Sequence, residues 1–292
     1  MSTLNLLIAI PTYNRAKLIT TAIRSLMQQQ NNGPRWSVLV VDNNSNDGTG
    51  ERLRELGQAW PRLASVREVK PGSSNARNCA LQTCRTDYLL FADDDSTFPT
   101  DYVDRALAII DDRRPLMFGG PIHPWFTEDP PKWFREEYGS YSLPQLTRRA
   151  RRISLSGANI CFSTEALRSV GGYDTALGIH GEARGYGEET DVECRILQRY
   201  GPDAVWYDPK FVNFHLVRPD RYRWRPLLRE HFQRGIARAR VARTADSGVA
   251  VPDCLRPRAP CRVVYSRRWQ NIAYERGLPV IRLVGLFYAR LL

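Results

Sequence analysis

Short apolar runs alternate with amphipathic helical patterns over the N-terminal part of the chain, and this alternation constrains the fold more than any other feature. The first cycle has an apolar run at 6–10, a polar break that begins with Pro11, and apolar residues at helical spacing over 18–27. Further strands are predicted at 37–41, 64–69, 88–92 and 116–118. Strands that alternate with helices indicate right-handed crossovers within one sheet. We therefore expect an α/β fold, with helices flanking a mostly parallel central sheet in a Rossmann-like arrangement.

The remainder of the chain is less regular and divides the molecule into two expected parts. A segment at 121–152 is rich in Pro, Trp, Tyr and Arg and is predicted to be an inserted loop region. The later expected elements are, in order, a short strand at Ile153, a turn at 157–159, a helix from near Ser163, a mobile Gly-rich loop at 178–187, a helix at 188–200, strands at 204–207 and 211–216, and an arginine-rich helix at 218–243. We expect one α/β domain over 1–217 and a basic helical C-terminal extension over 218–292.

The chain has 292 residues and a formal net charge of +11, which comes mainly from arginine. This charge favours anionic partners such as a nucleotide, a lipid phosphate or an anionic membrane. The six cysteines form no Cys-x-x-Cys pair and the core is large enough without disulfides, so we expect reduced thiols and a cytoplasmic location. The longest apolar tract, 278–292, is too short to span a bilayer and contains two arginines. The extension is therefore expected to make at most a peripheral contact with the inner face of the membrane.

Three consecutive carboxylates, Asp93, Asp94 and Asp95, follow the apolar run at 88–92. Open α/β sheets bind ligands at the carboxyl ends of their strands, and adjacent acids repel one another unless a cation or a hydrogen-bonding ligand offsets their charge. The alternative is a solvated loop in which one aspartate caps the next helix. Asp42 ends the strand at 37–41 in the same way, which predicts one cleft along this sheet edge.

The expected cleft lacks the usual loops for binding phosphate, because neither a Gly-rich dinucleotide fingerprint nor a Walker loop occurs in the sequence. A diphosphate bound there needs another counter-charge. A divalent cation held by Asp93 or Asp95 supplies it, and oxygen ligands favour Mg²⁺ or Mn²⁺.

Several motifs in fixed order make the sequence resemble family 2 of the glycosyltransferases over about residues 4–217. They are Ile-Ala-Ile-Pro-Thr-Tyr-Asn-Arg at 8–15, Val-Asp-Asn-Asn-Ser-Asn-Asp-Gly-Thr at 41–49, Asn-Ala-Arg-Asn at 75–78, the acidic triplet with Pro99, Gly-Gly-Tyr-Asp at 171–174 and Gly-Glu-Glu-Thr-Asp at 187–191. Each motif alone is weak, whereas the ordered set is specific. The resemblance implies a GT-A fold and an inverting transfer of a sugar from a nucleotide diphosphate donor, carrying UDP, GDP or dTDP, to a hydroxyl group of a glycan, glycolipid or polysaccharide.

The resemblance also implies roles for individual residues of the cleft. The nucleotide diphosphate sugar would be contacted by Pro11, Thr12, Tyr13, Arg15, Asp42, Arg77, Asp93 and Asp94. The divalent metal, Mn²⁺ or Mg²⁺, would be held by Asp95, Asp93 and His215. Which two of the three adjacent aspartates face the metal stays open at this point.

A single displacement at an anomeric carbon needs a base for the acceptor hydroxyl and a cation opposite the base for the leaving phosphate. The family places its base in a Glu-Asp pair that opens a helix. Here the pair is Glu188-Glu189, which departs from the family in its second member, and Asp191 follows. We expect Glu189 to be the base, with Glu188 or Asp191 as substitutes. The alternative is that these acids only stabilise the helix N-terminus.

Other polar and aromatic residues have a functional and a structural interpretation side by side. Aromatic rings either bind an acceptor sugar or pack under a loop. These two alternatives apply to Trp125, Trp133, Tyr138 and Tyr141. Asn159 is expected either to contact the donor sugar or to stabilise a turn. Arg218 and Arg221 are expected either to contact the diphosphate or to lie on a solvated basic helix. The alternatives for Arg148, Arg149, Arg151 and Arg152 are contact with a lipid-phosphate acceptor or a membrane, and exposure to solvent. His123, His180 and His231 receive no role.

Two other functional classes are weighed against glycosyl transfer. Nucleotidyltransferases that make nucleotide sugars share the alternating architecture, but they open with a Gly-rich loop carrying Arg and Lys where this chain has Pro-Thr-Tyr-Asn-Arg at 11–15. The positive charge alone would also suit nucleic acid, yet no nucleic-acid-binding motif accompanies it. The expected partners are therefore a nucleotide-sugar donor and a carbohydrate or lipid-linked acceptor, without nucleic acid.

Overall fold

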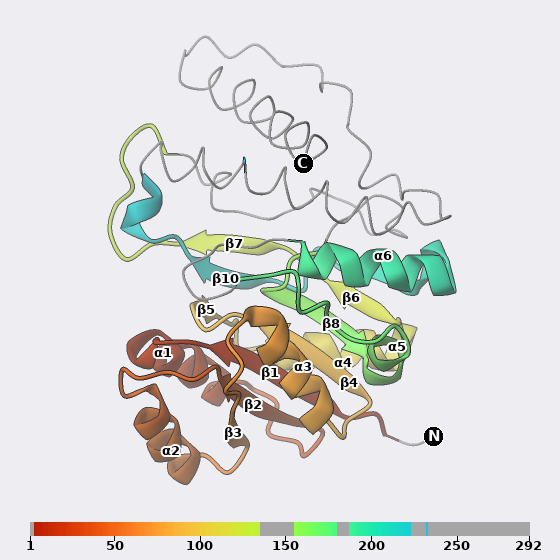
Figure 1. Ribbon diagram of the computed structural model, residues 1–292, viewed down its shortest axis with the longest axis horizontal. Helices are drawn as coiled ribbons and strands as arrows, with labels where there is room; N and C mark the ends of the chain where they lie inside the picture. Colours follow the sequence, from red (N-terminus) through yellow and green to blue (C-terminus); the bar gives the residue numbers. More distant parts are fainter. Residues whose placement is uncertain (1–2, 135–154, 180–186, 223–231, 233–292) are drawn as a thin grey trace.

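The computed structural model describes residues 3–134, 155–179, 187–222 and 232. These residues form an α/β domain around a seven-stranded sheet in the order β3-β2-β1-β4-β8-β6-β9 (Figure 1). The strands are β1 (Leu6–Thr12), β2 (Trp36–Asp42), β3 (Leu63–Arg67), β4 (Tyr88–Ala92), β6 (Met117–Gly119), β8 (Asn159–Ser163) and β9 (Val205–Tyr207). All neighbouring strands are parallel except β8, which is antiparallel to both β4 and β6. The expected mostly parallel α/β fold is confirmed.

Helices cover both faces of this sheet because successive side chains of a strand point to opposite faces. In β1, Leu6, Ile8 and Ile10 pack with the apolar faces of α1 (Ala16–Met27), α2 (Thr49–Ala59) and α4 (Tyr102–Arg113). The alternate residues, Leu7 and Ala9, pack on the other side with α3 (Ser73–Thr83), α5 (Thr164–Ser169) and α6 (Glu188–Tyr200). The near-continuous apolar strands of the sequence are therefore strands buried on both faces.

A second, three-stranded sheet lies beside the carboxyl end of β4 and has the order β5-β10-β7. Its strands are β5 (Ser96–Thr97), β7 (Ile122–Trp125) and β10 (Asn213–Leu216), and a 3-10 turn, η3 (Pro219–Tyr222), follows. A further 3-10 turn, η2 (Pro202–Ala204), precedes β9. In the antiparallel register His215 stands opposite Ser96, directly after the acidic triplet. This sheet brings a late segment of the chain to the end of β4.

Several expected element boundaries are wrong. The strand expected at Ile153 lies outside the described residues and stays a prediction. After the turn the structure has a strand that was not expected, β8, which begins at Asn159 and pairs with β4 and β6. The segment expected to be an irregular insertion contains β7, and α4 begins at Tyr102 instead of near Pro99. Pro219 starts a 3-10 turn where the arginine-rich helix was expected.

Much of the expected C-terminal extension and the Gly-rich loop over 180–186 lie outside the described residues, so the boundary at 217 and the membrane contact stay predictions. No helix among the described residues is long and apolar enough to cross a membrane. The four described cysteines form no disulfide.

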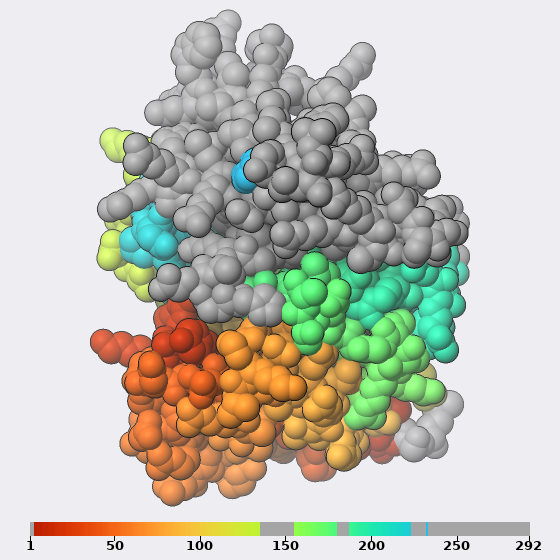
Figure 2. Space-filling view, viewed as in Figure 1, coloured from red at the N-terminus to blue at the C-terminus, as the bar shows by residue number. Residues whose placement is uncertain are grey.

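Figure 2 shows the first hundred or so residues, red to orange, gathered into one continuous body, with the green residues from 155 onward beside it.

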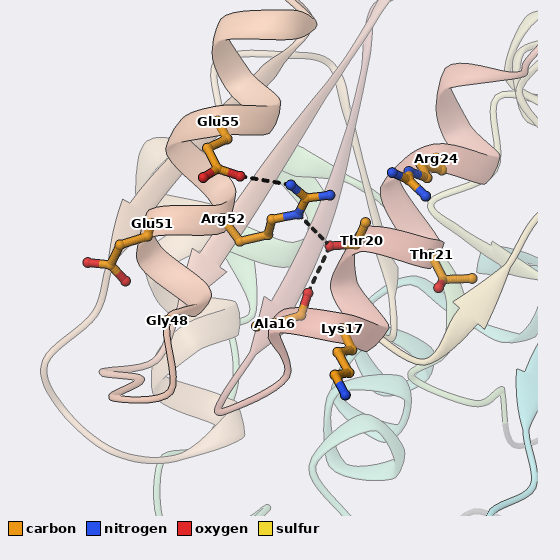
Figure 3. A pocket seen from close by; sticks show the side chains of 9 residues that line it. All are labelled: Ala16, Lys17, Thr20, Thr21, Arg24, Gly48, Glu51, Arg52 and Glu55. Atoms are coloured by element: carbon orange, nitrogen blue, oxygen red, sulfur yellow. Dashed lines mark hydrogen bonds and ion pairs between the residues drawn. The ribbon is translucent and has the colours of Figure 1, made fainter.

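A surface pocket of ≈ 480 Å³ lies between α1 and α2 (Figure 3). The Arg52 guanidinium crosses it and donates to the Thr20 hydroxyl at 3.0 Å and to Glu55 at 2.7 Å. Lysine, arginine and glutamate side chains all line it. None of the predicted site residues lines this pocket, and its Glu51 pairs with a residue outside it, Arg54, at 2.9 Å.

Candidate active site

The loops after β1 and β2 are joined to each other by hydrogen bonds. The Thr12 carbonyl accepts from the Asn43 N–H at 2.8 Å, and the Ser45 hydroxyl accepts from the Asn14 N–H at 2.9 Å. Asn14 adopts a φ of 53°, a region in which asparagine is tolerated better than most residues. The two loops therefore form one rigid rim at the carboxyl edge of the sheet.

Asp42 lies in this rim with only 7% of its surface exposed, and its carboxylate accepts the Ser45 N–H at 2.9 Å. Thr12 is also buried, whereas Tyr13 is 48% exposed. Pro11 and Arg15 are partly exposed. The structure thus brings the predicted nucleoside-contacting residues of both loops together along one edge.

The three adjacent aspartates point in different directions. Asp93, Asp95 and His215 each offer a ligand atom, and these atoms lie within 4.8 Å of one another. The Asp94 carboxylate instead accepts the Thr12 hydroxyl at 2.7 Å. The geometry groups the first and third aspartates with the histidine and directs the middle one toward the β1 loop.

Backbone hydrogen bonds hold this acidic turn in place. The Ser96 N–H donates to the Asp93 carbonyl at 3.2 Å, and the Leu216 N–H of β10 donates to the Asp95 carbonyl at 2.9 Å. The Trp125 indole donates to the same carbonyl at 3.4 Å. The backbone that carries Asp93 and Asp95 is therefore held in place by the small sheet.

Positive charge already faces this cluster. The His215 Nε2 lies 3.0 Å from Asp95 Oδ1 and 3.4 Å from Asp93 Oδ2, and an Arg218 nitrogen lies 2.6 Å from Asp95 Oδ2. Burial alone would lower the pKa of His215, but the two aspartates outweigh it and raise that pKa to about 10. Burial and the charge of Asp95 raise the pKa of Asp94 to about 7. The positive charges of His215 and Arg218 therefore offset the negative charges of Asp93 and Asp95 at this site.

The donor set of two carboxylates and one imidazole suits a divalent cation. Two hard oxygen ligands fit Mg²⁺ and Mn²⁺, and the imidazole nitrogen favours Mn²⁺ over Mg²⁺, which prefers oxygen alone. Asp93, Asp95 and His215 therefore fit the expected metal by their chemistry.

A second charged group lies at the N-terminus of α6, which begins after Gly187 at a φ of 106°. The Arg77 guanidinium of α3 lies 2.9 Å from a Glu188 oxygen and 3.1 Å from a Glu189 oxygen. The Arg77 side chain is 7% exposed, and its guanidinium carbon also lies over the Tyr173 ring, 5.4 Å from the ring centroid. One buried cation thus pairs with both carboxylates of the predicted base motif.

Burial raises the pKa of Glu189 to about 7, with help from the charge of Glu188 and against the charge of Arg77. The charge of Asp93 also contributes to raising this pKa. The predicted base and the acidic cluster are therefore close enough to interact electrostatically. A carboxylate with a pKa near neutrality is suited to accept a proton at physiological pH.

Asp191 has a different environment from the two glutamates. Its carboxylate accepts from Arg195, one turn later in α6, at 2.5 Å, and Arg195 also donates to the Val170 and Gly172 carbonyls. These contacts tie α6 to the loop after α5. The structure favours a structural role for Asp191, and it does not bring this residue into contact with Arg77.

The structure also separates the residues that had two interpretations. Asn159 is completely buried, and its side-chain amide bonds with Tyr102, Pro121 and Phe211, which favours the structural role over a sugar contact. The Trp125 indole donates to the backbone carbonyl of Asp95, which favours a structural role for this residue. Trp133 packs against Phe134 at a centroid distance of 5.8 Å. Residues with weighed roles that lie outside the described residues are Tyr138, Tyr141, Arg148, Arg149, Arg151 and Arg152, and so do His180 and His231, to which no role was given.

Sequence reasoning missed the ion pairs between α3 and α6. Arg77 was predicted to reach the nucleotide because of its motif, and nothing in the sequence places it against residues 188 and 189. It also missed the hydrogen bond from Thr12 to Asp94, since a contact between two strand ends depends on the sheet order. A polar residue at the end of each adjacent strand was the only signal.

Comparison with known proteins agrees with this geometry. The model of the family described as "Glycosyl transferase family 2" matches residues 7–173. Glycosyltransferase AglE of Haloferax volcanii is 26% identical over 187 residues, which are 63% of this chain and 61% of that protein. The succinoglycan biosynthesis protein ExoM of Rhizobium meliloti is 28% identical over 194 residues, 65% of this chain and 60% of that protein. The chain thus matches about three-fifths of the length of these two relatives.

Among solved structures, the mannosyltransferase PcManGT from Pyrobaculum calidifontis, in complex with GDP-mannose and Mn²⁺, superposes with a TM-score of 0.66 at 18% identity. The match covers 100% of this chain and 76% of that one. At this identity the likeness shows the fold, which is of the GT-A type. Because the family model covers more than half of the chain, this protein belongs to glycosyl transferase family 2.

Proposed function

We propose that this protein is a metal-dependent, inverting glycosyltransferase that moves a sugar from a nucleotide diphosphate to a hydroxyl group of a carbohydrate or lipid-linked acceptor. The observation that carries the proposal is the pairing of two charged groups at one sheet edge. One is the cluster of Asp93, Asp95 and His215, whose donor atoms suit a divalent cation. The other is Glu189, whose raised pKa is due in part to the charge of Asp93.

The metal would be held by Asp93, Asp95 and His215, and the chemistry it supplies when bound is neutralisation of the leaving diphosphate. The solved complex of PcManGT with GDP-mannose and Mn²⁺ supports this reading for a protein of the same fold. Arg218, which already contacts Asp95 at 2.6 Å, supplies a second positive charge beside the same site. This cluster provides the positive end of the reaction axis.

The nucleoside would lie along the rim made by the β1 and β2 loops. Asp42 is buried at its base with one carboxylate oxygen bonded to the Ser45 N–H. Exposed Tyr13 and partly exposed Arg15 lie on the outer side of the same rim. The rigid hydrogen-bonded loops would bind the nucleoside without large rearrangement, which reduces the entropic cost of binding.

Glu189 would act as the base of a single displacement. It takes the proton of the acceptor hydroxyl as that oxygen forms a bond to the anomeric carbon, and the bond from the anomeric carbon to the phosphate oxygen breaks on the opposite face. Inversion at the anomeric carbon follows from this geometry. Both glutamates pair with Arg77, but the Glu189 side chain is 21% exposed and that of Glu188 only 6%. Asp191 is paired with Arg195, so Glu189 is the acid best placed for the role.

The test is a transfer assay with GDP-, UDP- and dTDP-linked sugars and a panel of simple glycosides and lipid-linked sugars, followed by proton NMR of the anomeric signal. The expected product from an α-linked donor is β-linked. Glu189→Gln should retain donor binding and lose at least about a thousandfold in turnover, because general base catalysis and the local charge are both removed. The matched control is Glu165→Gln, which changes an exposed acid in the first turn of α5. Retention of configuration, or normal turnover by Glu189→Gln, would contradict the proposal.

A further inference from the structure

Gly157, in the turn before β8, lies directly against the paired side chains of Glu189 and Arg77. A Cβ atom built on this residue would lie 2.1 Å from Glu189 Oε1 and 2.7 Å from Arg77 Nη2. Real Cβ contacts are not found below 3.0 Å. The carboxylate therefore occupies the space that any other side chain at this position would fill.

The backbone does not explain why glycine stands here. Gly157 is not among the glycines with positive φ, so an alanine would meet no conformational strain at this position. The constraint on the side chain is steric, and it comes from the Glu189 carboxylate and the Arg77 guanidinium.

The turn that carries Gly157 is fixed on several sides. The Leu155 N–H donates to Glu193 of α6 at 3.2 Å, and the Ala158 carbonyl accepts from the Asn213 side chain at 2.5 Å. Asn159, the first residue of β8, is held by Tyr102 and Phe211. The turn is thus held in place, so the carboxylate is the group that must give way.

The Arg77 guanidinium in turn has few alternative positions. Arg77 is 7% exposed and is bonded on its other nitrogen to Glu188 at 2.9 Å, so the guanidinium cannot follow a displaced Glu189. To relieve the contact, the Glu189 carboxylate must move by roughly 1 Å, which lengthens its ion pair with Arg77. A displacement of that size in a reacting group costs about a hundredfold in rate.

We propose that Gly157 is a positioning residue. Because it has no side chain, it leaves the space in which the Glu189 carboxylate lies against Arg77, the position from which this carboxylate would take the proton of the acceptor. This inference rests on the proposed role of Glu189 as base. Neither the resemblance to the family nor the sequence pattern gave the turn at 157–159 this role.

The test is Gly157→Ala, with Gly57→Ala as the matched control. Gly57 lies in α2, where an added Cβ meets only an ordinary contact of 3.5 Å with the Leu63 carbonyl. We expect kcat to fall about a hundredfold in Gly157→Ala while the KM for the donor stays within about twofold, and both values to stay near wild type in the control. A fall of less than threefold in a folded Gly157→Ala protein would overturn the proposal.

A second arm uses Glu189→Asp, which shortens the side chain by one methylene and makes room for the added methyl group. In the Glu189→Asp background, Gly157→Ala should lower kcat less than fivefold and lower the melting temperature by less than it does in the wild-type background. Equal losses in both backgrounds would overturn the proposal, since a merely structural glycine would not respond to the length of residue 189.

The melting temperatures and a crystal structure of Gly157→Ala separate this inference from the proposed function, because neither depends on turnover. The expected distance from Glu189 Oε1 to Arg77 Nη2 in the variant exceeds 4 Å, against 3.1 Å in the wild type. If the wild type transferred no sugar but the carboxylate moved in this way, the proposed function would fail and the steric role of Gly157 would stand. An unmoved carboxylate would refute the steric role itself.

Discussion

Removing the Arg77 cation should strongly destabilise the fold, because two carboxylates depend on it. The Arg77 side chain is 7% exposed and lies 2.9 Å from Glu188 and 3.1 Å from Glu189, whose side chains are 6% and 21% exposed. Loss of one partner from a buried ion pair typically costs about 3–5 kcal/mol, since the remaining charge is left without compensation. We expect Arg77→Met, which keeps most of the side-chain volume, to lower the free energy of unfolding by about 4 kcal/mol at pH 8.

The assay is urea unfolding of four proteins: wild type, Arg77→Met, Glu188→Gln and the double variant. In Glu188→Gln the guanidinium keeps Glu189, so the loss should be small. In the double variant one of the two uncompensated carboxylates is gone. The coupling free energy of the cycle should therefore be about 2 kcal/mol, in the range found for residues of one ion-pair network.

The loss in Arg77→Met should also depend on pH in a defined direction. Arg77 lowers the pKa of Glu189 from the value that burial and Glu188 would impose, so its removal raises that folded-state pKa further above about 7. Stability from a group with a raised folded pKa is present at low pH and is lost as the pH rises through that value. The variant should thus be closer to wild type at pH 6 than at pH 8. A coupling below about 0.5 kcal/mol, or a loss that grows as the pH falls, would refute the reasoning.

Four further predictions follow from the site. The acid limb of the pH profile of kcat should have its midpoint near pH 7, the pKa of Glu189, and turnover should fall about tenfold per pH unit below it. Glu188→Gln should move this limb to lower pH, because the variant removes a negative charge that raises the pKa of Glu189. An unmoved limb would argue against that coupling. Arg218→Ala should raise the affinity for Mn²⁺ without nucleotide, measured by electron paramagnetic resonance, because the arginine contacts Asp95 at 2.6 Å, and a weaker affinity would contradict this. His215→Ala should weaken Mn²⁺ binding about tenfold or more while leaving the fold intact by circular dichroism, and unchanged binding would remove His215 from the ligand set. Asn159→Leu should lower stability by about 3 kcal/mol in urea unfolding, since it leaves Tyr102, Pro121 and Phe211 without their buried partner; a loss below about 1 kcal/mol would show that these bonds matter little.

The alternating apolar runs were sufficient to predict the parallel part of the sheet, because strands buried on both faces leave a direct mark on the sequence. The antiparallel strand β8 was not predicted in its place. Its apolar residues, Ile160, Cys161 and Phe162, form a run too short to be told from the start of a helix by periodicity alone. The two-residue strand β5 left no pattern at all, although it carries the register that brings His215 to the acidic turn.

The site shows the same division between local and long-range information. Motif order identified the acidic triplet and the glutamate pair as candidates, since each lies within a few residues of a strand end or a helix start. The ion pairs of Arg77 with Glu188 and Glu189 join positions more than a hundred residues apart. The contact of Gly157 with Glu189 depends on a missing side chain, which no pattern of polar or apolar residues records.

A nucleotide diphosphate and a divalent cation should bind together at the cluster of Asp93, Asp95 and His215. The most direct measurement is the melting temperature of wild type and Asp95→Asn with GDP, UDP or dTDP, each in the presence of Mn²⁺ or of EDTA. At a ligand concentration about a hundredfold above Kd, binding adds about 2.7 kcal/mol of stability, or roughly 5–10 °C in a domain of this size. We predict this rise for at least one nucleotide with the wild type and Mn²⁺, and its loss with EDTA or with Asp95→Asn. An equal rise in EDTA, or no rise with any of the three nucleotides, would contradict the claim.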